Sequence, residues 1–165
     1  MADPLSVQEV YRVLGGVMDP EVPALSVVEL GIVRDVAVAD GRVTVTVTPT
    51  YSGCPALREI EDDIRAALTA RGVGDVTIET VFAPAWTTDW IGPDAREKLR
   101  RFGIAPPGGA EPGGMITLTR RRRSVPCPFC ASSNTVLKSE FGSTACKAIH
   151  YCNACEQPFD EFKAF

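Results

Sequence analysis

The chain of 165 residues contains a single histidine, and this scarcity excludes some classes of metalloenzyme. Carboxylate-bridged di-iron centres in helical bundles take Glu-x-x-His pairs from two helices, and no such pair occurs in the sequence. A Gly-x-Gly-x-x-Gly loop after a strand is also missing, so no dinucleotide-binding fold is indicated. We therefore exclude a di-iron oxygenase and a nucleotide-dependent reductase.

Long apolar segments are missing as well. No run approaches the ~20 apolar residues that a membrane-spanning helix needs. The N-terminus lacks the basic-then-apolar layout of a signal peptide. We therefore expect a cytoplasmic protein with no membrane contact. In a reducing compartment, the six cysteines are better interpreted as metal ligands or reactive thiols than as disulfides.

Charge is unevenly distributed along the chain. Residues 1–115 hold 10 Lys and Arg against 17 Asp and Glu, whereas residues 116–165 hold 7 against 4. The acidic first part argues against nucleic-acid binding. We interpret the run Arg120 to Arg123 as the solvated end of a strand near a cluster of thiolates, in preference to a nucleic-acid-binding patch. We expect no nucleic-acid partner.

Cys54 occupies the point where a predicted strand turns into a predicted helix. Alternation of valine and threonine from Val43 to Thr48 indicates a half-buried strand, and apolar residues at helical spacing follow from Leu57 onwards. Gly53 permits a tight turn, and Pro55 suits the first helical position. A thiol at a helix start favours the thiolate form, which attacks electrophiles and binds metals. The alternative interpretation is a small buried residue at a helix start.

A second loop presents two carboxylates. Pro20 and Pro23 stiffen the segment that contains Asp19 and Glu21, although acidic turns are often only solvated. Around it the patterns predict a helix from Val7 to Val17, a hairpin of strands 32–38 and 42–48 turning at Asp40-Gly41, a helix to about residue 71 and a strand 76–82. This order predicts the α+β class, with a small mixed sheet and helices packed on one face.

The segment after the third strand contains both tryptophans, Trp86 and Trp90, and then a short predicted helix 94–102. We interpret the tryptophan segment as a partly exposed contact surface rather than core. Glycine and proline dominate residues 104–114, which we expect to be a linker. The predicted domains are therefore 1–103, α+β, and 115–165, with residues 115–119 a possible strand.

Four cysteines in the second domain form the most specific motif. Cys127-x-x-Cys130 and Cys152-x-x-Cys155 are separated by 21 residues, enough for a hairpin that brings the two pairs together. Two such pairs supply the four tetrahedral ligands of a closed zinc site, which predicts a C-terminal zinc ribbon with structural zinc; an iron site is the less favoured alternative. Cys146 and His150 remain as spare ligands, a second reactive thiol or ordinary hairpin residues.

Two resemblances follow from these motifs. Asp19-Pro20-Glu21, Thr50 and Cys54-Pro55 resemble the pattern of the iron–sulfur cluster assembly family that includes the SufT-type maturation factors, over roughly residues 5–82. The resemblance implies that Cys54, Asp19, Glu21 and Thr50 form a site that handles a transient iron ion, an iron–sulfur cluster or a client protein, with Cys54 as the ligand. A homodimer could bring two Cys54 thiolates to one cluster.

The tryptophan segment, residues 103–107 and the run Phe141 to Lys147 resemble the PaaD (PaaJ) family of phenylacetyl-CoA epoxidase subunits. This implies an accessory role in aerobic phenylacetate catabolism, beside an oxygenase with a di-iron centre and a flavin- and [2Fe–2S]-containing reductase. It implies those subunits as partners, and iron–sulfur assembly machinery as a further one. The first hypothesis is a maturation factor without enzymatic activity of its own, and the second is an adaptor that docks oxygenase to reductase. A thiol enzyme is the weakest, because it needs a base near the thiol and the sole histidine lies in the other domain.

Overall fold

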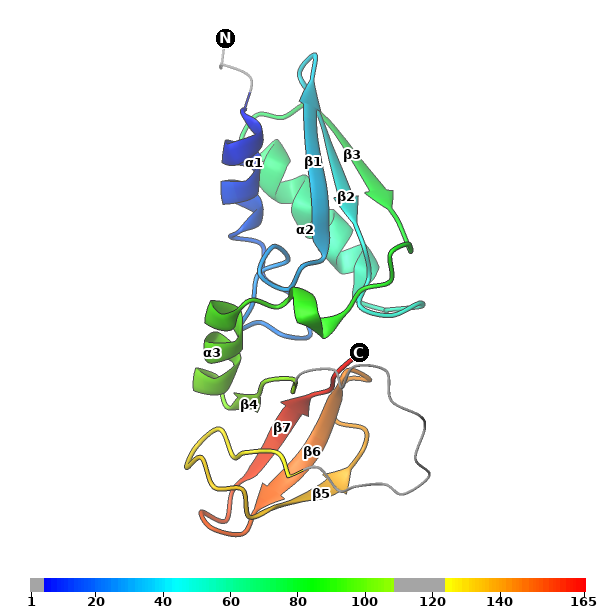
Figure 1. Ribbon diagram of the computed structural model, residues 1–165. Coiled ribbons are helices and arrows are strands. Elements are labelled where there is room, and N and C mark those ends of the chain that lie inside the picture. The colour runs from blue at the N-terminus through cyan, green and yellow to red at the C-terminus, as the bar shows by residue number, and fades with distance from the viewer. Residues whose placement is uncertain (1–4, 109–123) are drawn as a thin grey trace. The chain divides into compact units, whose positions relative to one another are not determined.

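The computed structural model describes residues 5–108 and 124–165 (Figure 1). The chain divides into two compact units, Met1–Ile91 and Gly92–Phe165, and each is described by itself. The predicted strand 115–119, most of the predicted linker and the run of four arginines lie outside the described residues. Within the described ranges, no helix is long and apolar enough to cross a membrane.

The first unit is built on a three-stranded mixed sheet in the order β1-β2-β3. Strands β1 (Val33–Ala39) and β2 (Arg42–Val47) are antiparallel, whereas β2 and β3 (Asp75–Thr80) are parallel. Asp40 and Gly41, which join β1 to β2, both have positive φ, as a tight hairpin turn requires. The hairpin that the Asp-Gly signal predicts is therefore confirmed.

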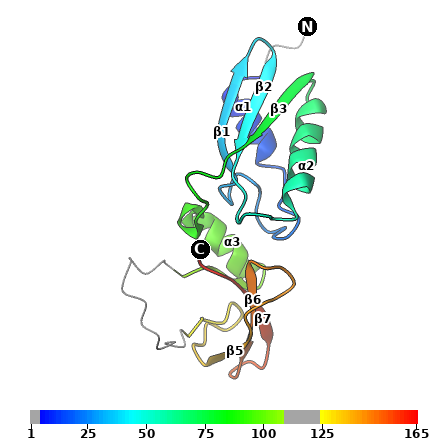
Figure 2. The same ribbon diagram turned by 90° about the vertical axis from the view of Figure 1, so that its right-hand side faces the viewer.

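Two helices cover one face of this sheet (Figures 1 and 2). Helix α1 (Val7–Leu14) begins at Ser6, whose hydroxyl accepts from the Glu9 N–H while the Glu9 carboxylate accepts from Ser6, a complete capping box. Helix α2 (Leu57–Thr69) lies in the connection between the parallel strands. The core between helices and sheet is formed by side chains that are at most 2% exposed: Val10, Leu14, Val43, Val45, Val47, Ile60, Ile64 and Leu68. The α+β class is as predicted.

Trp86 belongs to the core of the first unit, and the expectation of an exposed tryptophan surface is wrong for this residue. Its side chain is 5% exposed, and its indole N–H donates to the Leu30 carbonyl at 2.9 Å. Trp90, in the short helix η1 (Thr88–Trp90), is half-buried, and the Arg34 guanidinium lies 3.5 Å from its ring centroid. Trp86 therefore stabilises the first unit by core packing, and Trp90 does so by its cation–π contact.

The second unit contains α3 (Pro93–Arg101) and a four-stranded sheet in the order β4-β7-β6-β5. Its strands are β4 (Ile104–Ala105), β5 (Thr135–Ser139), β6 (Lys147–Cys152) and β7 (Pro158–Phe162). Residues 104 and 105, which we assigned to the linker, pair in parallel with Asp160 and Glu161 of β7. Residues 92–103 likewise group with the second unit rather than with the first. The division into independently folding domains, 1–103 and 115–165, stays a prediction.

Gly31 should be irreplaceable, because it has φ +77° and a Cβ there would lie 3.0 Å from Trp90 Cβ. We expect Gly31→Ala to lower the free energy of unfolding of the first unit by about 2–3 kcal/mol, from backbone strain plus the clash. Gly41→Ala is the matched control, since Gly41 has φ +78° with nothing within 4 Å of a built Cβ. Denaturation followed by tryptophan fluorescence reports on this unit, which contains both tryptophans. Equal losses in the two variants would contradict the steric contribution.

Candidate functional site: a thiol among carboxylates and a four-cysteine cluster

The acidic loop is held in shape by the carboxylate of Asp19. Its Oδ1 accepts the N–H groups of Glu21 at 2.8 Å and Val22 at 2.7 Å, and the Asp19 N–H donates to the Leu25 carbonyl at 2.9 Å. Asp19 is only 4% exposed, whereas Glu21 is partly exposed. Asp19 therefore fixes the backbone that presents Glu21, a stiffness that the two prolines alone would not provide.

Cys54 lies in the turn that leads into α2. Its N–H donates to the Tyr51 carbonyl at 3.2 Å, and its carbonyl accepts from the Leu57 N–H at 3.3 Å. Gly53 before it has φ +85°, as the turn requires. The helix begins at Leu57 with Ala56 as N-cap, so Pro55 lies before the helix. The prediction of Pro55 at the first helical position is therefore wrong.

The structure brings the four predicted residues together around the Cys54 thiol. Burial raises the pKa of Cys54 above its ordinary value, and the negative charges of Glu21 and Asp19 raise it further. A hydrogen bond from the Ala56 backbone and one from the Thr50 side chain lower this pKa, but they do not outweigh burial. The expected low-pKa thiolate is therefore wrong: the helix start is present, but half-burial and two carboxylates dominate, and the resting group is a thiol.

The carboxylates near Cys54 do not complete a metal-binding set with it. Among the described residues, only one group of three or more potential ligands has all its ligand atoms within 4.8 Å of one another, and that group is in the second unit. One thiol near two carboxylates suits transient contact better than permanent binding.

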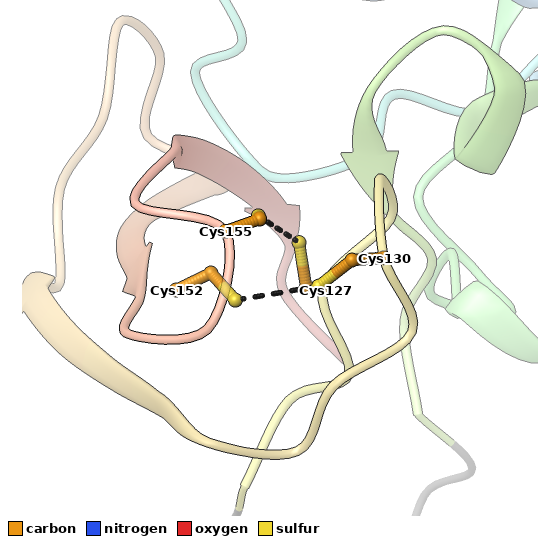
Figure 3. A group of neighbouring side chains, drawn as sticks. All are labelled: Cys127, Cys130, Cys152 and Cys155. Atoms are coloured by element: carbon orange, nitrogen blue, oxygen red, sulfur yellow. Dashed lines mark hydrogen bonds between the residues drawn. The ribbon is translucent and has the colours of Figure 1, made fainter.

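That group consists of the four cysteines predicted as zinc ligands (Figure 3). Cys127 Sγ lies 3.7 Å from Cys155 Sγ, and Cys130 Sγ lies 3.6 Å from Cys152 Sγ. A tetrahedral zinc ion with Zn–S bonds of about 2.3 Å places its sulfurs about 3.8 Å apart, so the four sulfurs fit this ion. Zinc bound there would be fully coordinated by thiolates, and its role would be to join the two ends of the ribbon.

The two cysteine pairs have the same local backbone. The residue after each pair, Ala131 or Glu156, has positive φ, at 61° and 59°. The first cysteine of each pair donates its N–H to a carbonyl five residues ahead, Cys127 to Ser132 and Cys152 to Gln157. Each pair is thus wrapped into a tight loop that directs both sulfurs to one point, which is the geometry that Cys-x-x-Cys spacing predicts.

Cys146 and His150 are not part of the four-cysteine cluster. Cys146 is 2% exposed, and its Sγ lies 3.1 Å from Thr144 Oγ1. His150 is 4% exposed, stacks on Phe159, and its Nε2 lies 2.8 Å from Glu161 Oε2. Their position favours the interpretation as packed ribbon residues. Glu161 was not predicted as the partner of His150, because the pairing depends on the register between β6 and β7.

Comparison with known proteins assigns both units. Residues 7–80 match a family model described as "Iron-sulfur cluster assembly protein", and residues 111–163 match one described as "PaaD zinc beta ribbon domain". A domain of unknown function from Bacillus anthracis superposes with a TM-score of 0.54 at 28% identity, over 56% of this chain and 90% of that one. A conserved hypothetical protein from Thermotoga maritima gives 0.52 at 35% identity, over 60% and 98%.

Curated relatives agree with this division. An "Fe-S protein maturation auxiliary factor" of Porphyromonas gingivalis (strain ATCC BAA-308 / W83) is 39% identical over 56% of this chain and 89% of its own length. A protein of Escherichia coli (strain K12), described as a putative subunit of 1,2-phenylacetyl-CoA epoxidase, is 46% identical over 97% of this chain and 94% of its own length. The fold and the sites thus define an iron–sulfur cluster assembly domain joined to a four-cysteine zinc ribbon. The chain belongs to the PaaD family, and both resemblances found in the sequence are confirmed.

Removing the charge of Glu21 should make Cys54 more reactive. Because the Glu21 carboxylate raises the pKa of Cys54, Glu21→Gln should lower that pKa and increase the thiolate fraction near pH 8. We expect roughly two- to fourfold faster alkylation of Cys54 by iodoacetamide, measured peptide by peptide with mass spectrometry, and a rate–pH profile shifted to lower pH. Glu79→Gln, on a residue that does not act on the Cys54 pKa, should leave the rate unchanged. A rate that is unchanged or slower in Glu21→Gln would contradict this electrostatic account.

Replacing either positive-φ residue of the ribbon with glycine should stabilise the ribbon. Ala131→Gly or Glu156→Gly removes a side chain from the left-handed region, and this should outweigh the extra freedom of the unfolded chain by about 0.5–1 kcal/mol. Competition with a chelator should then show tighter zinc binding, because folding and metal binding are coupled. Ala154→Gly, at a residue in the second cysteine pair without positive φ, should weaken binding or leave it unchanged. A gain in Ala154→Gly equal to those at residues 131 and 156 would contradict the explanation.

Proposed function

We propose that this protein is an accessory component of a phenylacetyl-CoA epoxidase and helps to mature the iron or iron–sulfur centres of the other components. The single observation that carries the proposal is the convergence of Thr50, Asp19 and Glu21 on the half-buried thiol of Cys54. Membership of the PaaD family, and a first unit shared with iron–sulfur maturation factors, support the choice of client and cargo.

The charges around Cys54 suit a cationic cargo. The thiolate and two carboxylates together carry three negative charges in a partly desolvated site, and this arrangement is unfavourable until a cation approaches. An arriving iron ion displaces the thiol proton and forms the metal–sulfur bond, so capture releases one proton per thiol. The Thr50 hydroxyl stabilises the sulfur in its charged form.

An incomplete ligand set would allow the metal to leave. With one thiolate from this site, the remaining ligands come from the client or from a second copy of the chain, and transfer exchanges one set for another. A closed four-thiolate site, such as the one in the ribbon, offers no such open position. We therefore assign the cargo to Cys54 and a structural zinc ion to the ribbon.

An adaptor that docks oxygenase to reductase without handling metal is the second candidate. Its predicted surface around Trp86 is lost to the core of the first unit. Exposed aromatic side chains elsewhere, Phe102 and Phe129, favour a docking role for the second unit. Docking and maturation are compatible, since a maturation factor must bind its client.

The decisive experiment is Cys54→Ser in cells that express the remaining epoxidase subunits. We expect the variant to remain folded, with the iron content and activity of the purified epoxidase lowered by roughly tenfold or more, because no other ligand in the site replaces the thiol. Ser52→Ala, an exposed change in the same loop, should leave both unchanged. A wild-type iron content in epoxidase produced together with Cys54→Ser would contradict the maturation proposal and favour the adaptor role.

A further inference from the structure

Two large exposed aromatic side chains of the second unit occur at Gly103, one in contact with the glycine and one next to it in the chain. Phe102 is 58% exposed and Phe129 is 57% exposed. The Phe129 ring lies against the glycine, since a Cβ built at Gly103 would be 3.0 Å from Phe129 Cε1, and Phe102 is the glycine's neighbour in the chain. Exposed aromatic groups brought to one place mark an interaction site more often than single exposed residues do.

Both aromatic residues sit on rigid backbone. Phe129 lies between two of the cysteine ligands, Cys127 and Cys130, in the first tight loop of the ribbon. Phe102 is the C-cap of α3, and its N–H donates to the Lys98 carbonyl at 3.0 Å. Side chains already held in place lose less conformational entropy when a partner covers them.

The residues around the aromatic pair are basic. Helix α3 carries four basic and two acidic side chains, and three of the basic ones, Lys98, Arg100 and Arg101, are exposed in its last turn. Lys98 precedes Phe102 by four residues and so lies on the same face of the helix. Arg100 and Arg101 share one carboxylate, that of Glu97, which leaves a net positive charge at this end of the helix.

A third exposed aromatic residue in the same unit lies away from the aromatic pair in the chain. Phe141 is 69% exposed, and the Lys163 ammonium lies 4.8 Å from the centroid of its ring. It lies outside α3 and outside both cysteine pairs. It therefore serves as the matched control for exposure alone.

We propose that Phe102, Phe129, Lys98, Arg100 and Arg101, the aromatic–basic surface, dock an acidic segment of another epoxidase subunit that also contributes an apolar side chain to cover the exposed rings. The aromatic pair supplies the apolar contact, and the basic end of α3 selects the acidic partner and steers its approach. This inference rests on the proposed function only for the identity of the partner.

The test is binding of the full-length chain, with zinc, to purified epoxidase assembled without this protein, measured by calorimetry. Phe102→Ser and Phe129→Ser should each raise the Kd by roughly ten- to thirtyfold, as loss of a central aromatic contact does. Arg101→Glu should weaken binding by roughly threefold or more at low ionic strength, with the difference disappearing towards about 1 M salt. Phe141→Ser should bind as the wild type does.

Phe129 lies beside a metal ligand, so the zinc content and thermal unfolding of each variant are measured first. Phe102→Ser and Arg101→Glu lie outside the cysteine pairs and keep the test valid if Phe129→Ser loses zinc. Wild-type affinity in Phe102→Ser and Arg101→Glu would overturn the inference, as would the absence of binding by the wild type. A homodimer that Phe102→Ser dissociates, with epoxidase binding unchanged, would overturn it in favour of a second copy as the partner.

The same assay separates this inference from the maturation proposal. Cys54→Ser tests the maturation proposal, because it should fail to restore the iron of the epoxidase whatever its affinity. Phe102→Ser should retain the reactive thiol but bind weakly. Failure of either result contradicts only the proposal that predicts it.

Discussion

The second unit depends on four sulfur atoms being held at one point. Its small buried cluster contains two of the cysteine ligands themselves, together with Ala105, Val125 and Phe159, and Cys155 packs against it. Leu99, Ala148 and Phe162 are also buried in this unit, but a unit of this size supplies limited hydrophobic stabilisation, and a metal ion bound by the four thiolates would add to what holds its strands together. Phe129 lies between Cys127 and Cys130, so a metal ion bound by these thiolates would also fix the loop that carries this part of the proposed docking surface.

The first unit organises its site by the opposite means. An apolar core fixes sheet and helices, and the proposed site lies on the loops that carry Asp19 and Cys54. One carboxylate oxygen of Asp19 accepts two backbone N–H groups, and these hydrogen bonds hold Glu21 near Cys54. The ribbon cluster is complete and closed, whereas the Cys54 site is partial.

Local patterns predicted what depends on local sequence. The Asp40-Gly41 hairpin and the Cys-x-x-Cys pairs follow from residues a few positions apart, and each was found as expected. The pKa of Cys54 was predicted with the wrong sign, because the helix start is visible in the sequence while burial and the approach of Glu21 are not. Trp86 was misplaced for a similar reason, since its partner is the carbonyl of Leu30, 56 residues earlier. The His150–Glu161 pair and the pairing of β4 with β7 required a strand register that composition does not specify.

The parallel pairing of β2 with β3 has a consequence for the order of assembly. Strands β1 and β2 meet through a two-residue turn, but β3 can join β2 only after the whole crossover, with the Cys54 loop and α2, has been made and folded back. Closing so long a connection is slower than closing a hairpin. We therefore expect the thiol loop to acquire its final shape late in folding, so that a nascent chain would not yet offer metal a finished site.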